Sequence, residues 1–232
     1  MEDTPKEASA KRKKRGIVAA IVATVAVVAG IGLFVWHEQP SFCSAICHTP
    51  MDGYLDTYDA QAGEPAVDKW GNEVADAQGM LAANHGTEEV GATCMSCHVP
   101  TMSEQISEGM AWIAGDYTLV ENETRTGGGA LPERSIADLT EARGVAADQF
   151  CLNEDCHDVT RDDLTEMTDP GVNELGLPLR NPHSWRHGEV ACSDCHKAHR
   201  ASVLTCTECH AEMELPEGWI SAQELKQMEH TA

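Results

Sequence analysis

The distribution of apolar residues changes once along the chain, near residue 37. Residues 16–36 form a run of twenty-one residues without a charge. As a helix this run is about 31 Å long, which is enough to cross the hydrocarbon core of a bilayer. Beyond it, apolar residues recur in short stretches at helical spacing and strand-like alternation is nearly absent. The pattern predicts one N-terminal transmembrane helix followed by a mostly α-helical and irregular domain.

Three short helices are predicted within that domain. Met51 begins an amphipathic stretch that continues to Tyr58. The sequences 101–104 and 221–224 have the pattern of a capping box, so each predicts the start of a helix. In the helix after residue 101, apolar side chains repeat at helical spacing, and we expect this stripe to pack on the core or on a bound group. The stripe consists of Ile106, Met110, Ile113 and Tyr117.

The charges beside the apolar run predict its orientation. The basic block KRKKR at 11–15 precedes it, and basic flanks remain in the cytoplasm. We therefore expect a single-pass protein of the cytoplasmic membrane, with residues 1–15 a disordered tail inside and the domain on the outer face. A cleaved signal peptide is the alternative, but its apolar region is usually shorter and is followed by a small-x-small site.

Three copies of the pattern C-x-x-C-H are the clearest indication of chemical function in the sequence. They end at His98, His196 and His210. This is the attachment signature of c-type haem, in which two thiols bond to the haem vinyl groups and the adjoining histidine binds the iron. Their cysteines are Cys94, Cys97, Cys192, Cys195, Cys206 and Cys209.

The other four cysteines follow the same order with longer inserts. Cys43 and Cys47 precede His48 as C-x3-C-H, and Cys151 and Cys156 precede His157 as C-x4-C-H. All ten cysteines are then used, and a histidine follows every second one. The sequence predicts five covalently attached haem c groups.

Two other uses of the cysteines are less consistent with the pattern. The spacing of residues 192–209 suits a four-cysteine zinc site, and an even cysteine count outside the cytoplasm suits a disulfide scaffold. Neither accounts for the five histidines that follow the cysteine pairs.

Six histidines lie outside the motifs, and four of them are candidate second axial ligands. A six-coordinate haem with two histidines has a low potential and suits electron transfer. The candidates near motifs are His85, His183, His187 and His199. His37 lies at the membrane edge and His230 near the C-terminus, where we expect solvated surface residues. For the first haem, Met51 offers a thioether three residues beyond His48.

The N-terminal part of the chain resembles the NapC/NirT/NrfH family of membrane-anchored multihaem cytochromes. The resemblance covers about residues 11–105 and is most specific in the stretch from His85 to Pro100. Members oxidise quinol and pass electrons to a reductase on the outer side. The resemblance implies that Met51 is an axial ligand of the first haem and that His85 serves a later haem; whether His48 or Met51 binds the first iron stays open.

Residues 183–210 are similar to the tetrahaem domains of flavocytochrome fumarate reductases. There a histidine just after the motif is a distal ligand, which matches His199. The chain has no flavin or nucleotide fingerprint, so the resemblance implies the haem packing without the flavin activity.

Composition and the positions of glycine and proline complete the predicted domain organisation. Only 5% of residues are aromatic, so we expect the haems to form the core. Gly127–Gly129 and Pro132 indicate a linker. The predicted units are a basic tail (1–15), an anchor (16–36), an N-terminal dihaem region (37–117), a linker (118–149), a trihaem region (150–212) and a C-terminal helix and tail (213–232).

These features predict a membrane-anchored pentahaem cytochrome that relays electrons from menaquinol or another quinol to an extracytoplasmic reductase in anaerobic respiration. Its partner would be a cytochrome, molybdenum or flavin enzyme. The sequence is also compatible with a homo-oligomer. Asp52, Glu38 and Lys69 are candidate proton acceptors at the quinol site. A net charge of −22 excludes nucleic acid as a partner. The alternative is a multihaem terminal reductase or periplasmic shuttle that acts directly on a small acceptor.

Overall fold

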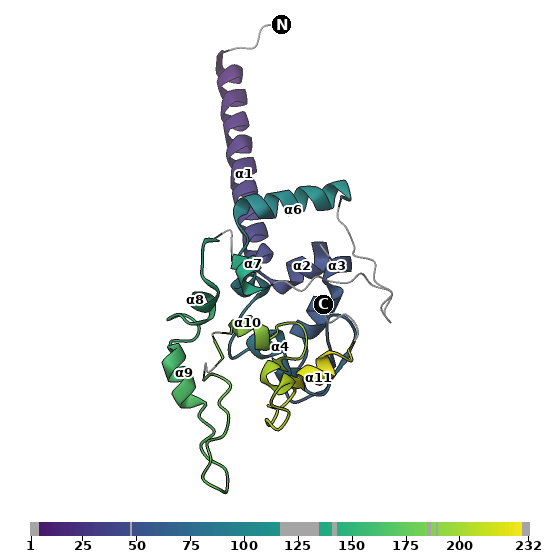
Figure 1. Cartoon of the computed structure of the whole chain (residues 1–232). Coiled ribbons are helices and arrows are strands. Elements are labelled where there is room, and N and C mark those ends of the chain that lie inside the picture. The colour runs from purple at the N-terminus through teal and green to yellow at the C-terminus, as the bar shows by residue number, and fades with distance from the viewer. Residues whose placement is uncertain are drawn as a thin grey trace.

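A long N-terminal helix, α1 (Pro5–His37), extends away from the rest of the molecule in the computed structural model (Figure 1). The structure describes residues 5–46, 48–116, 135–140, 143–184, 187–188 and 190–228. Residues 13–37 of α1 are long and apolar enough to cross a membrane, as a transmembrane anchor or a signal sequence would be. The helix begins well before residue 16, so the disordered tail predicted for residues 1–15 is wrong from Pro5 onward. Lys, Arg, Glu and Ala dominate residues 6–15, and all four favour helix.

A small aromatic cluster joins α1 to α2 (Pro40–Ile46). The ring of Phe42 lies edge-on to Trp36 at 5.1 Å and to His37 at 4.9 Å between ring centroids. The Trp36 indole donates to the Ser41 hydroxyl at 3.2 Å. His37 is therefore partly buried in this cluster, which differs from the solvated surface residue that the sequence predicted.

The helices after α2 are short, as the sequence predicted. Most span a single turn or two, and α6 is the longest described after α1. They are α3 (His48–Tyr58), η1 (Ala77–Gly79), α4 (Leu81–His85), α5 (Cys94–Cys97), α6 (Met102–Ala114), α7 (Ile136–Thr140), α8 (Ala147–Cys151), α9 (Arg161–Met167), α10 (Cys192–Cys195), η3 (Thr205–Glu208) and α11 (Ala222–Leu225).

Both predicted capping boxes are present. Thr101 accepts from the Glu104 amide, and Ser221 does the same for Glu224. Helix α6 ends at Gly115, which has a φ of 67°. Helix α11 is one turn long, so Met228 lies beyond its end.

The apolar stripe of α6 does not pack on the core. Its described side chains are 60–71% exposed. Of the two expectations for this stripe, packing on the core or on a bound group, the first is therefore wrong. Tyr117, predicted as its last member, lies outside the described residues.

Two pairs of two-residue strands are described. Strand β1 (Ala66–Val67) pairs antiparallel with β2 (Glu73–Val74), with Ala66 opposite Val74. Strand β3 (Val203–Leu204) pairs parallel with β4 (Ile220–Ser221), with Val203 opposite Ile220. The fold of the described residues is thus mostly helical and irregular, as predicted.

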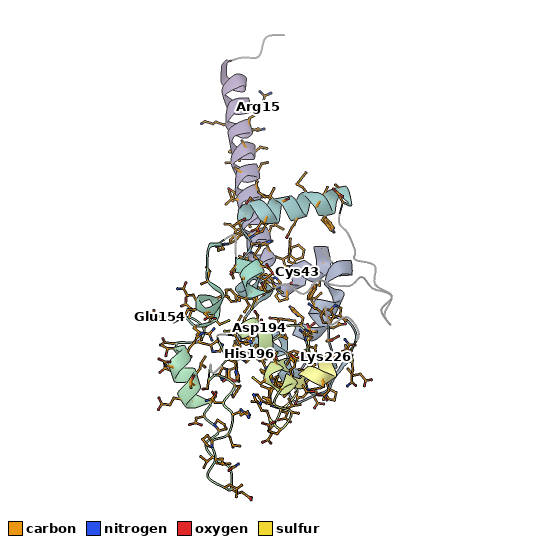
Figure 2. All side chains as sticks on the ribbon, viewed as in Figure 1. Arg15, Cys43, Glu154, Asp194, His196 and Lys226 are labelled. Carbon is orange, nitrogen blue, oxygen red and sulfur yellow. The ribbon has the colours of Figure 1, made fainter. Side chains whose placement is uncertain are left out.

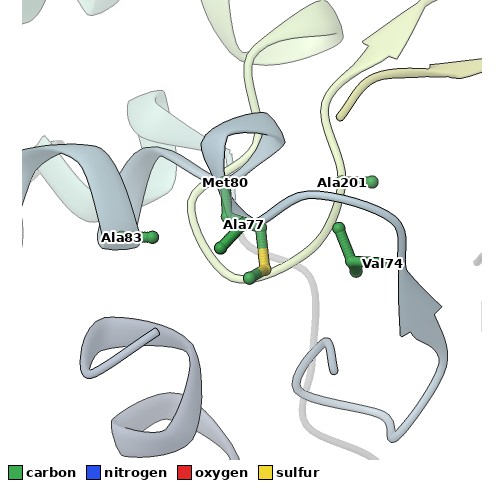
Figure 3. Close-up of a cluster of buried hydrophobic side chains, with 5 residues drawn as sticks. All are labelled: Val74, Ala77, Met80, Ala83 and Ala201. Carbon is green, nitrogen blue, oxygen red and sulfur yellow. The ribbon is translucent and has the colours of Figure 1, made fainter. Parts of the chain in front are cut away.

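The buried apolar core is small and built largely from alanines. Its cluster is Val74, Ala77, Met80, Ala83 and Ala201 (Figure 3). Beside it two backbone segments touch, because a Cβ on Gly79 would lie 2.0 Å from the carbonyl oxygen of Gly218. Gly218 itself has a φ of +74°. Glycine at both positions therefore lets the C-terminal segment pack directly on the η1 backbone.

Two helices lie in the range predicted as a linker between haem groups. Helix α7 and the first residues of α8 fall within 118–149. Residues 118–134, with the triple glycine, lie outside the described residues. The Arg143 guanidinium donates to the carbonyls of Val99 and Pro100, which ties this stretch to the segment after the second motif.

Candidate functional site

Four cysteine–histidine motifs share one backbone hydrogen bond. In each, the amide of the histidine donates to the carbonyl of the first cysteine, at 2.8 Å from His98 to Cys94, 2.9 Å from His196 and from His210, and 3.2 Å from His157 to Cys151. In the three C-x-x-C-H motifs this is an ordinary helical i to i+4 contact. The motif that ends at His157 makes the same contact across six residues, so its longer insert leaves the histidine in the equivalent place.

Asn153 closes that insert. Its side-chain oxygen accepts from the amides of Asp155 at 3.0 Å and Cys156 at 3.1 Å. Its amide nitrogen donates to the carbonyls of Gln149 and Phe150. These bonds fold the two additional residues into a compact turn, which supports reading 151–157 as a true haem-attachment motif.

The nine described cysteines all have free thiols, and thiols of successive motifs interact. A hydrogen bond from Cys43 lowers the pKa of Cys94 to about 7, and the same bond raises the pKa of Cys43. Cys151 lowers the pKa of Cys192 to about 7 in the same way. The thiols of the first cysteines of motifs one and two therefore interact, as do those of motifs three and four.

Weaker electrostatic interactions link the thiols of motifs two and three and those of motifs four and five. Burial raises the pKa of Cys97, and the charge of Cys156 adds to this shift. Burial likewise raises the pKa of Cys206, with a contribution from Cys195. Among the described cysteines, each motif thus has a thiol that interacts with a thiol of the next motif in the sequence.

Each predicted distal histidine lies opposite one motif histidine. The ring centroids are 6.1 Å apart for His85 and His157, 6.3 Å for His98 and His199, 6.3 Å for His183 and His196, and 6.1 Å for His187 and His210. The planes of three pairs are 15–30° apart, whereas those of His85 and His157 are 80° apart.

This separation fits one metal ion between two imidazoles. With a metal–nitrogen distance of about 2.0–2.1 Å and roughly 1.1 Å from nitrogen to ring centroid, opposite imidazoles have centroids about 6.2–6.4 Å apart. The residues present therefore fit a haem iron in each of the four pairs.

Hydrogen bonds fix the tautomer of three distal histidines. Thr57 Oγ1 donates to the Tyr54 carbonyl at 2.7 Å, so it accepts from His199 Nδ1–H, also at 2.7 Å. Thr168 Oγ1 donates to the Leu164 carbonyl and accepts from His183 Nδ1–H at 2.9 Å.

His85 Nδ1–H donates to the Leu81 carbonyl at 2.8 Å, one turn earlier in α4. In all three rings a proton on Nδ1 leaves the Nε2 lone pair free for a metal. This is the tautomer that axial ligation through Nε2 requires.

The environment of His196 favours the neutral imidazole that binds metal. Burial lowers its pKa to about 4, and the neighbouring charge of His183 contributes. Burial also lowers the pKa of His183, followed by the charge of Arg161. The Trp219 ring covers His196 edge-on at 4.9 Å, and Tyr54 covers His199 at 4.8 Å.

Other predicted site residues lie elsewhere or outside the described part. The side chains of His48, Met51 and Asp52, residue Cys47, and His230 are not among those described. Lys69 lies near the second motif's pair, because its Nζ is 5.6 Å from the Tyr54 ring and its amide donates to the His199 carbonyl. Glu38 lies 3.4 Å from His37 Nδ1 at the end of α1.

Thr57 and Thr168 were not identified from the sequence. Neither belongs to a motif, and each meets its histidine through the tertiary fold, over 142 and 15 positions respectively. Asn181, which accepts from the His183 amide at 2.8 Å, was also missed, although this contact is local and spans only two positions. A threonine near a haem motif carries no signal of its own in a single sequence.

Comparison with known proteins agrees with this geometry. Residues 137–211 match the cytochrome c3 family. The chain is 52% identical over 222 residues to the cytochrome c-type protein Cgr1 of Eggerthella lenta, and the match covers 96% of this chain and 94% of Cgr1. The chain belongs to the multihaem c-type cytochromes. Covalently bound haem c is therefore the cofactor of this cytochrome.

A second relative covers a smaller part of the cytochrome. The acrylate reductase cytochrome subunit of Shewanella woodyi is 36% identical over 70 residues, which is 29% of this chain and 54% of that subunit. No solved structure matches the cytochrome significantly. The comparisons thus indicate electron transfer.

Proposed function

We propose that this protein is a membrane-anchored pentahaem cytochrome that takes electrons from a quinol and passes them to an extracytoplasmic reductase. The observation that carries the proposal is the set of four histidine pairs with ring centroids 6.1–6.3 Å apart. Two imidazoles on one iron leave no open position for a substrate, which favours electron transfer over chemistry on a small acceptor.

The chain's own residues would hold the haems in sequence order. The ten cysteines tether them, and four of the motif histidines pair with distal partners from other parts of the chain. Bound haem supplies reversible one-electron exchange between Fe(III) and Fe(II). Interactions between thiols of successive motifs, from Cys43 to Cys206, support neighbouring attachment points for successive haems.

The direction of transfer follows from the position of the two ends. Cys43 lies beside the end of α1, and His196 lies further from it (Figure 2). A lipid-soluble donor would therefore meet the first motif, close to the anchor, and an extracytoplasmic partner would meet the later ones. Asp52 and Lys69 are the proposed proton acceptors for quinol oxidation; Asp52 belongs to α3, the helix that begins at His48.

The partner is proposed to be a reductase of the outer side. Similarity to an acrylate reductase cytochrome subunit supports an assembly in which this cytochrome delivers electrons to a separate catalytic subunit. The comparison supports this class of partner without naming its substrate.

Spectroscopy of membranes that contain the full chain tests the proposal. A menaquinol analogue should reduce the haems rapidly, as shown by a reduced-minus-oxidised difference spectrum. Addition of dithionite should then reduce any low-potential haem that remains. If the quinol analogue reduces none of the haems while dithionite reduces them all, quinol oxidation is contradicted and a soluble electron donor is the alternative.

A further inference from the structure

Helix α6 exposes a continuous apolar stripe on one face. At 100° per residue, Met102, Ile106, Met110 and Ile113 lie within about 80° of one another around the helix. Their exposed fractions are 63%, 60%, 60% and 71%. The opposite face carries Glu104 and Glu108. A helix of this pattern buries its apolar face against something when the protein is in its working environment.

The exposure of this stripe equals that of the apolar helix α1. The large apolar side chains of α1 between Ile17 and Val35 are 55–64% exposed. Single exposed apolar residues are ordinary on a protein surface, but four on one helical face form a patch. The side chains of α6 are thus as uncovered as those of a helix that is long and apolar enough to cross a membrane.

The orientation of α6 identifies what covers it. In Figure 1, α6 runs crosswise to α1, and it is the helix of the domain that lies farthest toward the N-terminal end of α1. If α1 runs along the bilayer normal, a helix crosswise to it runs parallel to the membrane plane, on the side of the domain that faces the bilayer. A helix in the interface buries its apolar face about 5–10 Å into the boundary between headgroups and acyl chains.

We propose that α6 is an interfacial helix that rests on the lipid surface through Met102, Ile106, Met110 and Ile113. The proposal rests on the proposed membrane anchoring by α1. The two contacts are separate, because α1 crosses the bilayer whereas α6 lies on its outer surface. With α6 tied to the second motif through Thr101 and the adjoining Val99–Pro100 segment, this second contact fixes how the haem domain sits on the membrane.

The acidic face of α6 agrees with this orientation. Glu104 caps its own helix by accepting from Thr101, and its face points away from the stripe. Because the described α6 carries no lysine or arginine, its attachment depends on apolar burial rather than on attraction to anionic headgroups. Binding of α6 should therefore depend little on the charge of the lipid.

Membrane-depth measurements on the full-length haem-loaded protein test the proposal. Because the ten cysteines are needed for haem, a nitroxide is introduced through a ketone-bearing unnatural amino acid, at one position per variant. Positions 106 and 113 report the stripe, and positions 104 and 108 report the opposite face. The protein is reconstituted in vesicles of phosphatidylethanolamine and phosphatidylglycerol at 4:1 and, separately, in phosphatidylcholine.

The expected result is opposite accessibility on the two faces. Labels at 106 and 113 should collide more often with oxygen than with a water-soluble nickel chelate, and labels at 104 and 108 should show the reverse, in both lipid mixtures. Equal chelate accessibility at all four positions would overturn the proposal. Low collision with both reagents at 106 and 113 would also overturn it, since it would mean that protein or haem covers the stripe.

Flotation of the vesicles distinguishes failure of the interfacial-helix proposal for α6 from failure of the proposed anchoring by α1. Protein that floats with the vesicles while its α6 labels remain in water refutes the interfacial helix and leaves anchoring by α1 intact. Protein that does not float refutes anchoring itself, and with it the proposal for α6. The visible spectrum of each labelled variant shows that its haems are in place before the measurement.

Discussion

Thr57 and His199 are 142 positions apart in the sequence, and their side chains meet at 2.7 Å. The hydroxyl of Thr57 has one proton, which it donates to the Tyr54 carbonyl. It therefore accepts the Nδ1 proton of His199 and orients the ring toward His98. A fully buried threonine in this way leaves Nε2 of His199 as the nitrogen that is free to bind the proposed iron.

Replacing Thr57 by valine should raise the reduction potential of the haem between His98 and His199. The valine keeps the volume but leaves the Nδ1 proton without its acceptor, so the imidazole donates less charge to the iron. The unsatisfied buried group should also cost about 1–3 kcal/mol of stability. A potentiometric titration followed by visible absorbance measures the shift.

Thr57→Ser is the matched control. It retains the hydroxyl and should restore the potential of the parent protein even if stability remains lower. Equal potentials for the parent and Thr57→Val would show that the hydroxyl does not act on His199.

The haem between His85 and His157 should have a distinct electron paramagnetic resonance signal. Parallel imidazole planes both interact with the same iron d orbital and split it from its partner, whereas planes 80° apart leave the two nearly degenerate. The oxidised protein should therefore show one strongly anisotropic low-spin signal from this haem, beside rhombic signals from the pairs at 15–30°. His85→Ala should remove the anisotropic signal and leave the rhombic ones. Loss of a rhombic signal instead would assign His85 to another haem.

Asn153→Ala should reduce haem attachment at the third motif. The asparagine makes four hydrogen bonds, two to carbonyls that precede the motif, of Gln149 and Phe150, and two to amides of the motif, of Asp155 and Cys156. Without them the two thiols of this motif lose their fixed separation, and intact mass should show a population that lacks one haem. Glu154→Ala, at an exposed position in the same insert, should retain the full complement. Full haem loading of Asn153→Ala would mean that the turn forms without the side chain.

Gly79→Ala should destabilise the domain strongly. The added methyl group would meet the Gly218 carbonyl oxygen at 2.0 Å, and backbone must move to relieve the clash. The cost should be about 1–3 kcal/mol or more, as for other overpacked positions. Gly109→Ala in α6 is the control, because its new methyl meets nothing within 4 Å and helix propensity improves by up to about 1 kcal/mol. Thermal unfolding followed by circular dichroism compares the two, and equal midpoints would contradict the close packing.

Much of this architecture could be predicted from local patterns. The helix over 16–36, the capping boxes at Thr101 and Ser221, and the motif histidines each depend on residues within a few positions of one another. The predicted distal candidates were the histidines that lie opposite motif histidines in the structure. Their pairing could not be predicted, because His98 meets His199 and His85 meets His157 across the fold.

Contacts that depend on the whole fold were missed. The side chains of Thr57 and Thr168 look like ordinary helix residues in the sequence. The stripe of α6 was expected to pack on the core or on porphyrin, because periodicity shows that a face is apolar and not what covers it. The tail before residue 16 was expected to be disordered, but it is helical from Pro5 because most of its residues favour helix.

Intact mass spectrometry of the purified full-length protein tests the central claim most directly. If each cysteine pair carries a covalent haem, the mass should equal that of the polypeptide plus five haem groups, and reduction of disulfides should not change it. A mass equal to the bare polypeptide, or one with fewer than five haems in the fully matured protein, would contradict the account.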